Sequence, residues 1–186
     1  MLLNGVRKAA IATASRRGNT EMERAMTLSL RESVHLVSDP RNLDASVEEV
    51  FQLMLGVNCE RVPGPIEIEP ESVTSVVGFG GLLSGACVFR TGGSASLKIA
   101  ERMTGMEFPE LDDTVKDGIG EICNMIAGAW KGKVPDLSAN CGLSVPAVIT
   151  GRDYNLHVQA PEFKLNHCYR FEGMGFEVTI ICDGLQ

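Results

Sequence analysis

Residues 110–131, ELDDTVKDGIGEICNMIAGAWK, carry the clearest helical pattern in this chain of 186 residues. Apolar side chains recur there at steps of four, four, three, four and three residues: Leu111, Val115, Ile119, Ile122, Ile126 and Ala129. Steps of three and four residues place side chains on one face of an α-helix. We therefore expect a long helix over these residues, with this face buried in the core.

A second stripe on the same helix is polar. Its members also recur at steps of three and four residues: Thr114, Asp117, Glu121, Asn124 and Gly128. Side chains three residues apart are neighbours on a helix surface, so Glu121 and Asn124 can act on the same molecule. We take this pair as the candidate catalytic site.

Three glycines interrupt the helical pattern, at Gly118, Gly120 and Gly128. Each should cost about 1 kcal/mol relative to alanine inside a helix. We interpret Gly120 and Gly128, which flank the polar pair, as partner-docking positions where another molecule's backbone can approach the helix closely. The alternative is that they serve packing within the protein.

Helical and strand-like patterns alternate along the rest of the chain. A helix is predicted from Asn42 to its stop at Gly56, followed by an exposed strand in PIEIEP (65–70), where isoleucine alternates with glutamate. Residues 74–93 predict a hairpin that turns at Gly80–Gly81. Residues 94–104 predict a shorter helix with serine caps that stops at Gly105. Further strand-like runs cover 143–151, 155–160, 168–173 and 176–183.

The order is thus a helix followed by strands, twice. A faint internal repeat supports this order, because Asn58-Cys59 ahead of Pro65 resembles Asn140-Cys141 ahead of Pro146. We expect an α+β fold in which two long helices pack on a mainly antiparallel sheet.

Composition restricts the partners and the location. A net charge of −7, without a cluster of basic residues after the N-terminal stretch, argues against nucleic-acid binding. No apolar run reaches the ~18 residues of a membrane span. The six cysteines include no C-x-x-C pair, which favours reduced thiols and a cytoplasmic location. Residues 1–41 are expected to be a mobile extension ahead of a folded domain at 42–186, although residues 21–40 could hold a short helix or a strand.

The polar pair suits positioning chemistry. A carboxamide such as that of Asn124 does not titrate, but it can hold a water by donating one hydrogen bond and accepting another. Glu121 could pair with a lysine of a partner. No P-loop, H-E-x-x-H or G-x-S-x-G motif is present, so we expect no metal or cofactor bound by this chain. The substrate is expected to be another protein that carries its own metal and phosphoryl group.

The stretch GEICNMIAG (120–128) resembles the G-E-x-x-N-x-x-x-G signature of the CheX/CheC family of chemotaxis phosphatases. The resemblance implies a CheC-like fold of two intertwined helix-plus-strands repeats and hydrolysis of the phosphoaspartate of a CheY-like response regulator. Asn124 would orient the attacking water and Glu121 would bind the regulator's lysine. Mg²⁺ would arrive with the regulator, and the protein would form a homodimer.

Several alternatives stay open. A single motif fits CheX better than CheC, but Glu49 and Gln52 on the first helix could be either a solvated face or a residual second site. Trp130 could be an interface anchor or part of the core. The isolated His35, His157 and His167 are expected to be structural. The competing functional hypothesis is a non-catalytic binding module of the flagellar-switch type.

Overall fold

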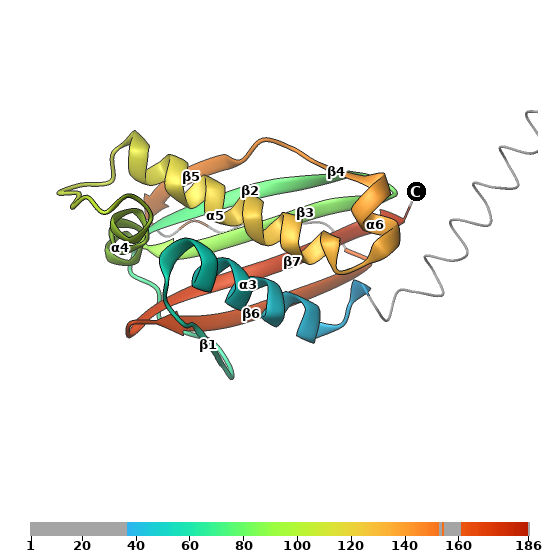
Figure 1. Cartoon of the computed structure of the whole chain (residues 1–186), viewed down its shortest axis with the longest axis horizontal. Helices are drawn as coiled ribbons and strands as arrows, with labels where there is room; N and C mark the ends of the chain where they lie inside the picture. Colours follow the sequence, from blue (N-terminus) through green and yellow to red (C-terminus); the bar gives the residue numbers. More distant parts are fainter. Residues whose placement is uncertain (1–36, 153, 155–160, 186) are drawn as a thin grey trace, which may run out of the picture. The chain divides into compact units, whose positions relative to one another are not determined.

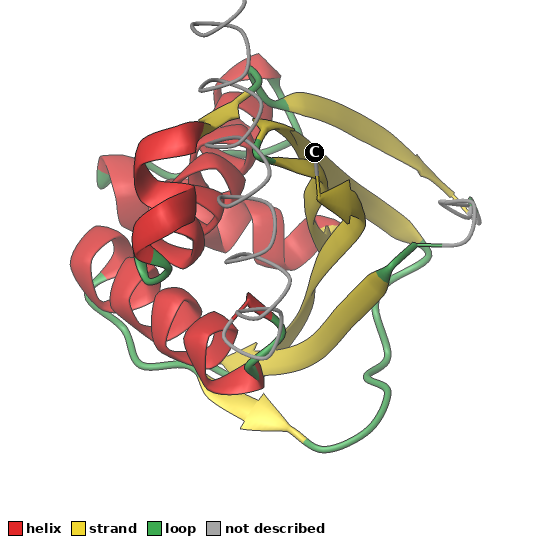
Figure 2. Ribbon diagram, turned by 90° about the vertical axis from the view of Figure 1, so that its right-hand side faces the viewer, coloured by secondary structure: helices red, strands yellow, loops and turns green. Residues whose placement is uncertain are grey.

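Two antiparallel hairpins meet at the centre of a seven-stranded sheet, and helices cover one of its faces (Figures 1 and 2). The computed structural model describes residues 37–152, 154 and 161–185. Most of the predicted extension (1–41) and the predicted strand at 155–160 therefore lie outside the described residues, as do His35 and His157. In chain order the elements are α3 (Pro40–Leu55), β1 (Glu60–Val62), β2 (Glu71–Gly81), β3 (Leu83–Gly92), α4 (Gly93–Thr104), α5 (Asp113–Gly132), α6 (Pro135–Asn140), β4 (Cys141–Leu143), β5 (Ala147–Arg152), β6 (Phe163–Phe171) and β7 (Met174–Leu185).

The sheet order explains how the two repeats interlock. The strands lie in the order β1-β6-β7-β3-β2-β4, with β5 also paired to β2, and all pairs are antiparallel. Each repeat contributes one hairpin, β2–β3 or β6–β7, and the hairpins join through β3 and β7. The strand after each long helix pairs with the other repeat: β1 with β6, and β4 with β2. The predicted fold of two intertwined repeats is therefore confirmed.

The helices pack on the sheet through a continuous apolar core. α3 and α5 cross the same face in opposite directions, α5 over the β2–β3 hairpin (Figure 1). Phe51 of α3 is fully buried, and its ring stacks on Phe176 of β7 at a centroid distance of 4.4 Å. Trp130 of α5 is also fully buried and packs on Phe79 at 5.2 Å. Trp130 therefore belongs to the core and is no surface anchor.

Most helix and turn predictions are confirmed. The first helix ends at Leu55, and its predicted stop, Gly56, is the C-cap and adopts a left-handed conformation with φ of 65° that glycine accepts without strain. The hairpin predicted around Gly80–Gly81 turns at Leu82, and the shorter helix stops at Gly105. The long helix begins at Asp113, three residues later than Glu110, because Asp112 is its N-cap.

The predicted strand at 65–70 is wrong. Residues 63–70 form no strand, and β1 lies earlier, at Glu60–Val62. Three prolines and one glycine fall within 63–70, and proline has no N–H to donate to a ladder. Ile66 instead packs on β7: its Cδ1 lies 3.0 Å from where a Cβ would stand at Gly175.

Two further expectations need correction. The serine caps of the shorter helix are absent: Gly92 is the N-cap, and the Glu69 carboxylate accepts the hydrogen bond from the backbone N–H of Ser94 at 2.8 Å. The predicted strand at 143–151 is two strands, β4 and β5, separated by residues 144–146. The short helix α6, which begins at a proline, was not predicted. In the part of the chain that the structure describes, every helix is too short or too polar to span a bilayer.

Candidate active site on helix α5

The sequence fixes where α5 begins and which face it buries. The Asp112 side chain accepts a hydrogen bond from the backbone N–H of Val115 at 2.9 Å, which satisfies one of the free donors of the first turn. Four members of the predicted apolar stripe are fully buried: Val115, Ile119, Ile122 and Ile126. The helix is therefore held in one rotational setting, and the opposite face is turned outward.

A small residue lets α5 approach the sheet closely. Cys123 is fully buried, and its Sγ lies 3.5 Å from the carbonyl oxygen of Ser75 on β2 and 3.6 Å from that of Cys87 on β3. The hydrogen bond with Cys123 and burial raise the pKa of the Cys87 thiol, so it stays protonated at neutral pH. Asn124, the next residue after Cys123, is thus attached to a helix in direct contact with two strands.

The candidate catalytic pair lies on the outward side of α5. Glu121 is exposed and Asn124 is half-buried. Neither side chain has a hydrogen-bond or ion-pair partner within the part of the chain that the structure describes. The pair, one helical turn apart, therefore presents a carboxylate and a carboxamide that are available to another molecule.

The two glycines beside the pair differ from one another. Gly120 is buried, and a Cβ there would stand 3.3 Å from Pro146 Cβ and 3.5 Å from Val148 Cγ2. Its missing side chain makes room for the chain's own β4–β5 region, which supports the alternative that Gly120 serves packing within the protein. Sequence reasoning could not distinguish the two uses, because Pro146 lies on a different element.

Gly128 remains available as a docking position. It is half-buried, and a Cβ there would meet only Leu143 Cδ1, at an ordinary contact distance of 3.9 Å. Of the two predicted docking glycines, Gly128 alone has room above the helix surface.

The pair on the first helix is arranged differently. Glu49, Gln52 and Gly56 repeat the spacing of Glu121, Asn124 and Gly128. However, Glu49 forms an ion pair with Lys133 Nζ at 2.9 Å, and the helix has already ended at Leu55. The carboxylate that would correspond to Glu121 is thus engaged within the protein.

A polar cluster in which a histidine and a tyrosine are buried was not predicted from the sequence. His167 of β6 is 5% exposed, and its Nδ1 lies 2.8 Å from Asp44 Oδ1 of α3, which also accepts a 2.8 Å hydrogen bond from Tyr169. Arg61 of β1 pairs with the second carboxylate oxygen at 3.0 Å. Burial, followed by the bond to Asp44, raises the pKa of the Tyr169 phenol. The cluster links α3 to the edge of the sheet, as expected for a structural histidine.

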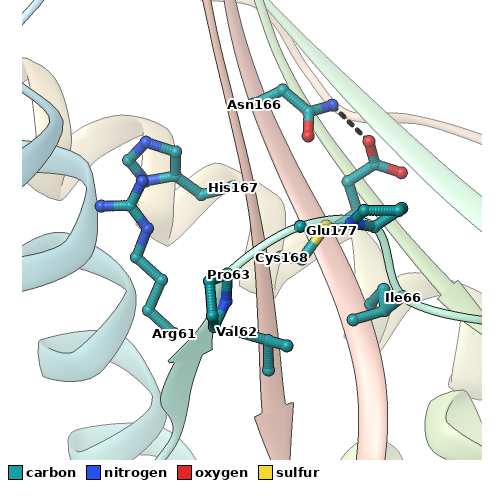
Figure 3. Close-up of a pocket in the computed structure, with 10 residues that line it drawn as sticks. Arg61, Val62, Pro63, Ile66, Asn166, His167, Cys168 and Glu177 are labelled. Carbon is teal, nitrogen blue, oxygen red and sulfur yellow. Dashed lines mark hydrogen bonds between the residues drawn. The ribbon is translucent and has the colours of Figure 1, made fainter.

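Beside this cluster is a pocket of about 310 Å³, bounded by β1, residues 62–66, β6 and β7 (Figure 3). Its polar side chains bind one another. Asn166 donates hydrogen bonds to Glu177 and to Thr179, the latter at 3.0 Å, and Arg61 is held by Asp44. These contacts stabilise the β1–β6–β7 edge. Across the described residues, no group of three or more His, Cys, Asp or Glu side chains is placed to hold a metal ion.

Comparison with known proteins shows the family of the chain. Residues 73–167, which include all of α5, match the family described as chemotaxis phosphatase CheX, and the chain belongs to this family. The CheY-P phosphatase CheX of Thermotoga maritima is 31% identical over 119 residues, covering 61% of this chain and 76% of that protein. The resemblance predicted from GEICNMIAG is thereby confirmed.

Solved structures share the fold. The crystal structure of chemotaxis protein CheX from Vibrio vulnificus has a TM-score of 0.67 at 19% identity and covers 78% of this chain and 97% of that chain. The structure of a CheX–CheY–BeF3–Mg²⁺ complex from Borrelia burgdorferi has a TM-score of 0.60, also at 19% identity, covering 77% and 97%.

The two glycines of α5 should respond oppositely to leucine. Gly120→Leu is expected to lower the free energy of unfolding by about 1–3 kcal/mol, because the side chain would collide with Pro146 and Val148. Gly128→Leu should leave it unchanged or raise it by up to about 1 kcal/mol, because leucine is the better helix former. Urea denaturation measures both. Equal destabilisation of the two variants would contradict the distinct environments of the two glycines.

Proposed function

We propose that this protein accelerates hydrolysis of the phosphoaspartate of a CheY-like response regulator. The observation that carries the proposal is the pair Glu121 and Asn124, side by side on the outward face of a firmly packed helix and without partners among the described residues. The Thermotoga relative is named a CheY-P phosphatase, and the Borrelia structure is a complex of CheX with CheY, BeF3 and Mg²⁺.

The proposed reaction is an in-line hydrolysis. Asn124 holds a water through its carboxamide, and the water oxygen attacks phosphorus as the bond to the aspartyl oxygen breaks. The products are inorganic phosphate and the free aspartate of the regulator. Mg²⁺, bound by the regulator, would offset the charge of the phosphoryl oxygens. The contribution of Asn124 is positioning, which does not require a titrating group.

Glu121 has a different proposed role. Its exposed carboxylate would pair with the regulator's active-site lysine and hold the phosphoryl group in front of Asn124. Gly128, one turn beyond Asn124, would leave space for the regulator's backbone, so the stable Gly128→Leu variant should lose activity. A non-catalytic binding module of the flagellar-switch type would need neither a water-orienting carboxamide nor an open Gly128.

The function is tested by the decay of phosphorylated CheY-like regulators with and without the protein, and Asn124→Ala is the decisive variant. Decay should return to the spontaneous rate, because only the water-orienting group is lost. The free energy of unfolding should change by less than ~1 kcal/mol, since Asn124 makes no hydrogen bond among the described residues. Acceleration by Asn124→Ala at the wild-type rate would contradict the mechanism.

Charge reversal at Glu121 tests the anchoring role. Glu121→Lys should weaken binding of the regulator by at least tenfold, because it replaces an attraction to the partner's lysine by a repulsion. Calorimetric titration with the regulator in its BeF3- and Mg²⁺-bound form measures this affinity without turnover. Glu49→Lys on α3 is the control for a change of net charge. Unchanged affinity in Glu121→Lys would rule out the ion pair.

We also propose that the protein is a homodimer in the cytoplasm. All six cysteines are free thiols, as a reducing compartment would maintain. The apolar strand β7 does not supply the pairing edge, because it lies inside the sheet between β6 and β3. Among the described residues, β5 pairs on one side only, with β2, and its Ile149 is 43% exposed, so we propose β5 as the pairing edge.

Dimerisation through β5 predicts a specific change of mass. Light scattering should give twice the chain mass at micromolar concentration, and Ile149→Lys should shift the mass toward that of one chain because a charge blunts an exposed edge. A single-chain mass for the wild type at high micromolar concentration would exclude the dimer and leave the phosphatase proposal unaffected.

A further inference from the structure

The connection between β4 and β5 runs along the Asn124 side of α5. Leu143, at the end of β4, lies beside Gly128, and Pro146, just before β5, lies beside Gly120. Asn124 is four residues from each glycine and therefore lies between them on the same row of the helix surface. Residues 143–146, called the 143–146 segment below, thus pass along the row of the helix surface that holds Asn124.

Hydrogen bonds fix this segment to the sheet. The backbone N–H of Ser144 donates to the carbonyl oxygen of Gly78 at 2.9 Å, and the Gly78 N–H donates to Ser144 Oγ at 2.9 Å. The Ser144 hydroxyl in turn donates to the carbonyl oxygen of Val145 at 2.9 Å. Val145 is therefore held in place although its side chain contacts little of the protein.

Val145 is 86% exposed, the highest value among the exposed large apolar side chains of the described residues. The others are Leu53 at 72%, Met106 at 56% and Ile149 at 43%. Exposed apolar side chains are common on protein surfaces when they are isolated. Val145 differs because Ser144 binds its backbone carbonyl and because its neighbours Leu143 and Pro146 lie against the row of α5 that holds Asn124.

We infer that the 143–146 segment is the second half of the docking surface and that Val145 contacts the response regulator beside its phosphorylated aspartate. This inference rests on the proposed function. The partner it fits is a protein domain that offers a lysine to Glu121, a phosphoryl group to Asn124 and an apolar side chain to Val145. Gly120 serves this surface indirectly, since it lets Pro146 lie against α5.

Such a contact adds affinity and leaves the chemical step unchanged. Val145 lies beside the reacting groups but has no polar atom to contribute to them. Its contact would be made equally in the bound ground state and in the transition state, and uniform binding of this kind lowers KM without raising kcat. Val145 is therefore a binding residue, whereas Asn124 acts in the chemical step itself.

The test compares Val145→Asp with a matched control, Leu53→Asp on α3, in the full chain. Val145→Asp should raise KM for the phosphorylated regulator, and Kd for its BeF3- and Mg²⁺-bound form, by at least about tenfold, with kcat within about twofold of the wild type. Leu53→Asp should change neither constant. Val145→Ile should keep wild-type values, because it preserves the apolar contact. Thermal melting verifies that the variants are folded.

The other outcomes are distinct. Wild-type KM and Kd in Val145→Asp, with an active wild-type protein, would overturn this inference and leave the proposed function standing. A shift toward single-chain mass in Val145→Asp without any change in Kd would assign the segment to a second copy of this chain and would also overturn it. A wild-type protein that neither binds nor dephosphorylates any regulator would remove the proposed function and this inference together.

Discussion

The antiparallel pairing of β3 with β7 is the contact on which the rest of the structure depends. It is the junction between the two repeats, and its register runs from Leu83↔Leu185 to Thr91↔Phe176. The ring centroids of Phe89 and Phe176, from these two strands, lie 5.3 Å apart. The ring of Phe51 from α3 packs against both. With this junction in place, each long helix has an apolar surface to cover, and its rotational setting follows.

The packing of α5 on the sheet fixes the position of the candidate catalytic pair. Asn124 has no hydrogen-bond partner among the described residues, yet its backbone is fixed because Cys123 contacts two strands and the apolar stripe of α5 is buried. A catalyst that works by orienting water needs its groups held to within a fraction of an ångström. The conformational entropy of fixing the backbone of Asn124 is therefore lost when the protein folds, and not when the partner binds.

Features that depend on local periodicity, such as the helices, could be predicted from the sequence. The helical steps of three and four residues identified α3 and α5, and the same pattern placed Glu121 beside Asn124. The predictions were incomplete where the role of a residue depends on a segment far away in the sequence. The packing role of Gly120 depends on Pro146, and the partner of His167 is Asp44, which is 123 residues away. The prediction of a strand at 65–70 was wrong because the prolines cannot donate hydrogen bonds to a sheet, although isoleucine and glutamate alternate there as in a strand.

The exchange of strands between the repeats has a consequence for how the chain folds. Glu60 of β1 pairs with Arg170 of β6, so the first repeat cannot complete its own part of the sheet until almost the whole chain is available. Non-local pairings of this kind slow folding, because a long loop must close before any contact compensates for it. During synthesis from the N-terminus, the β2–β3 hairpin emerges with both edges unpaired. In that interval a neighbouring nascent chain competes with the protein's own second half for those edges.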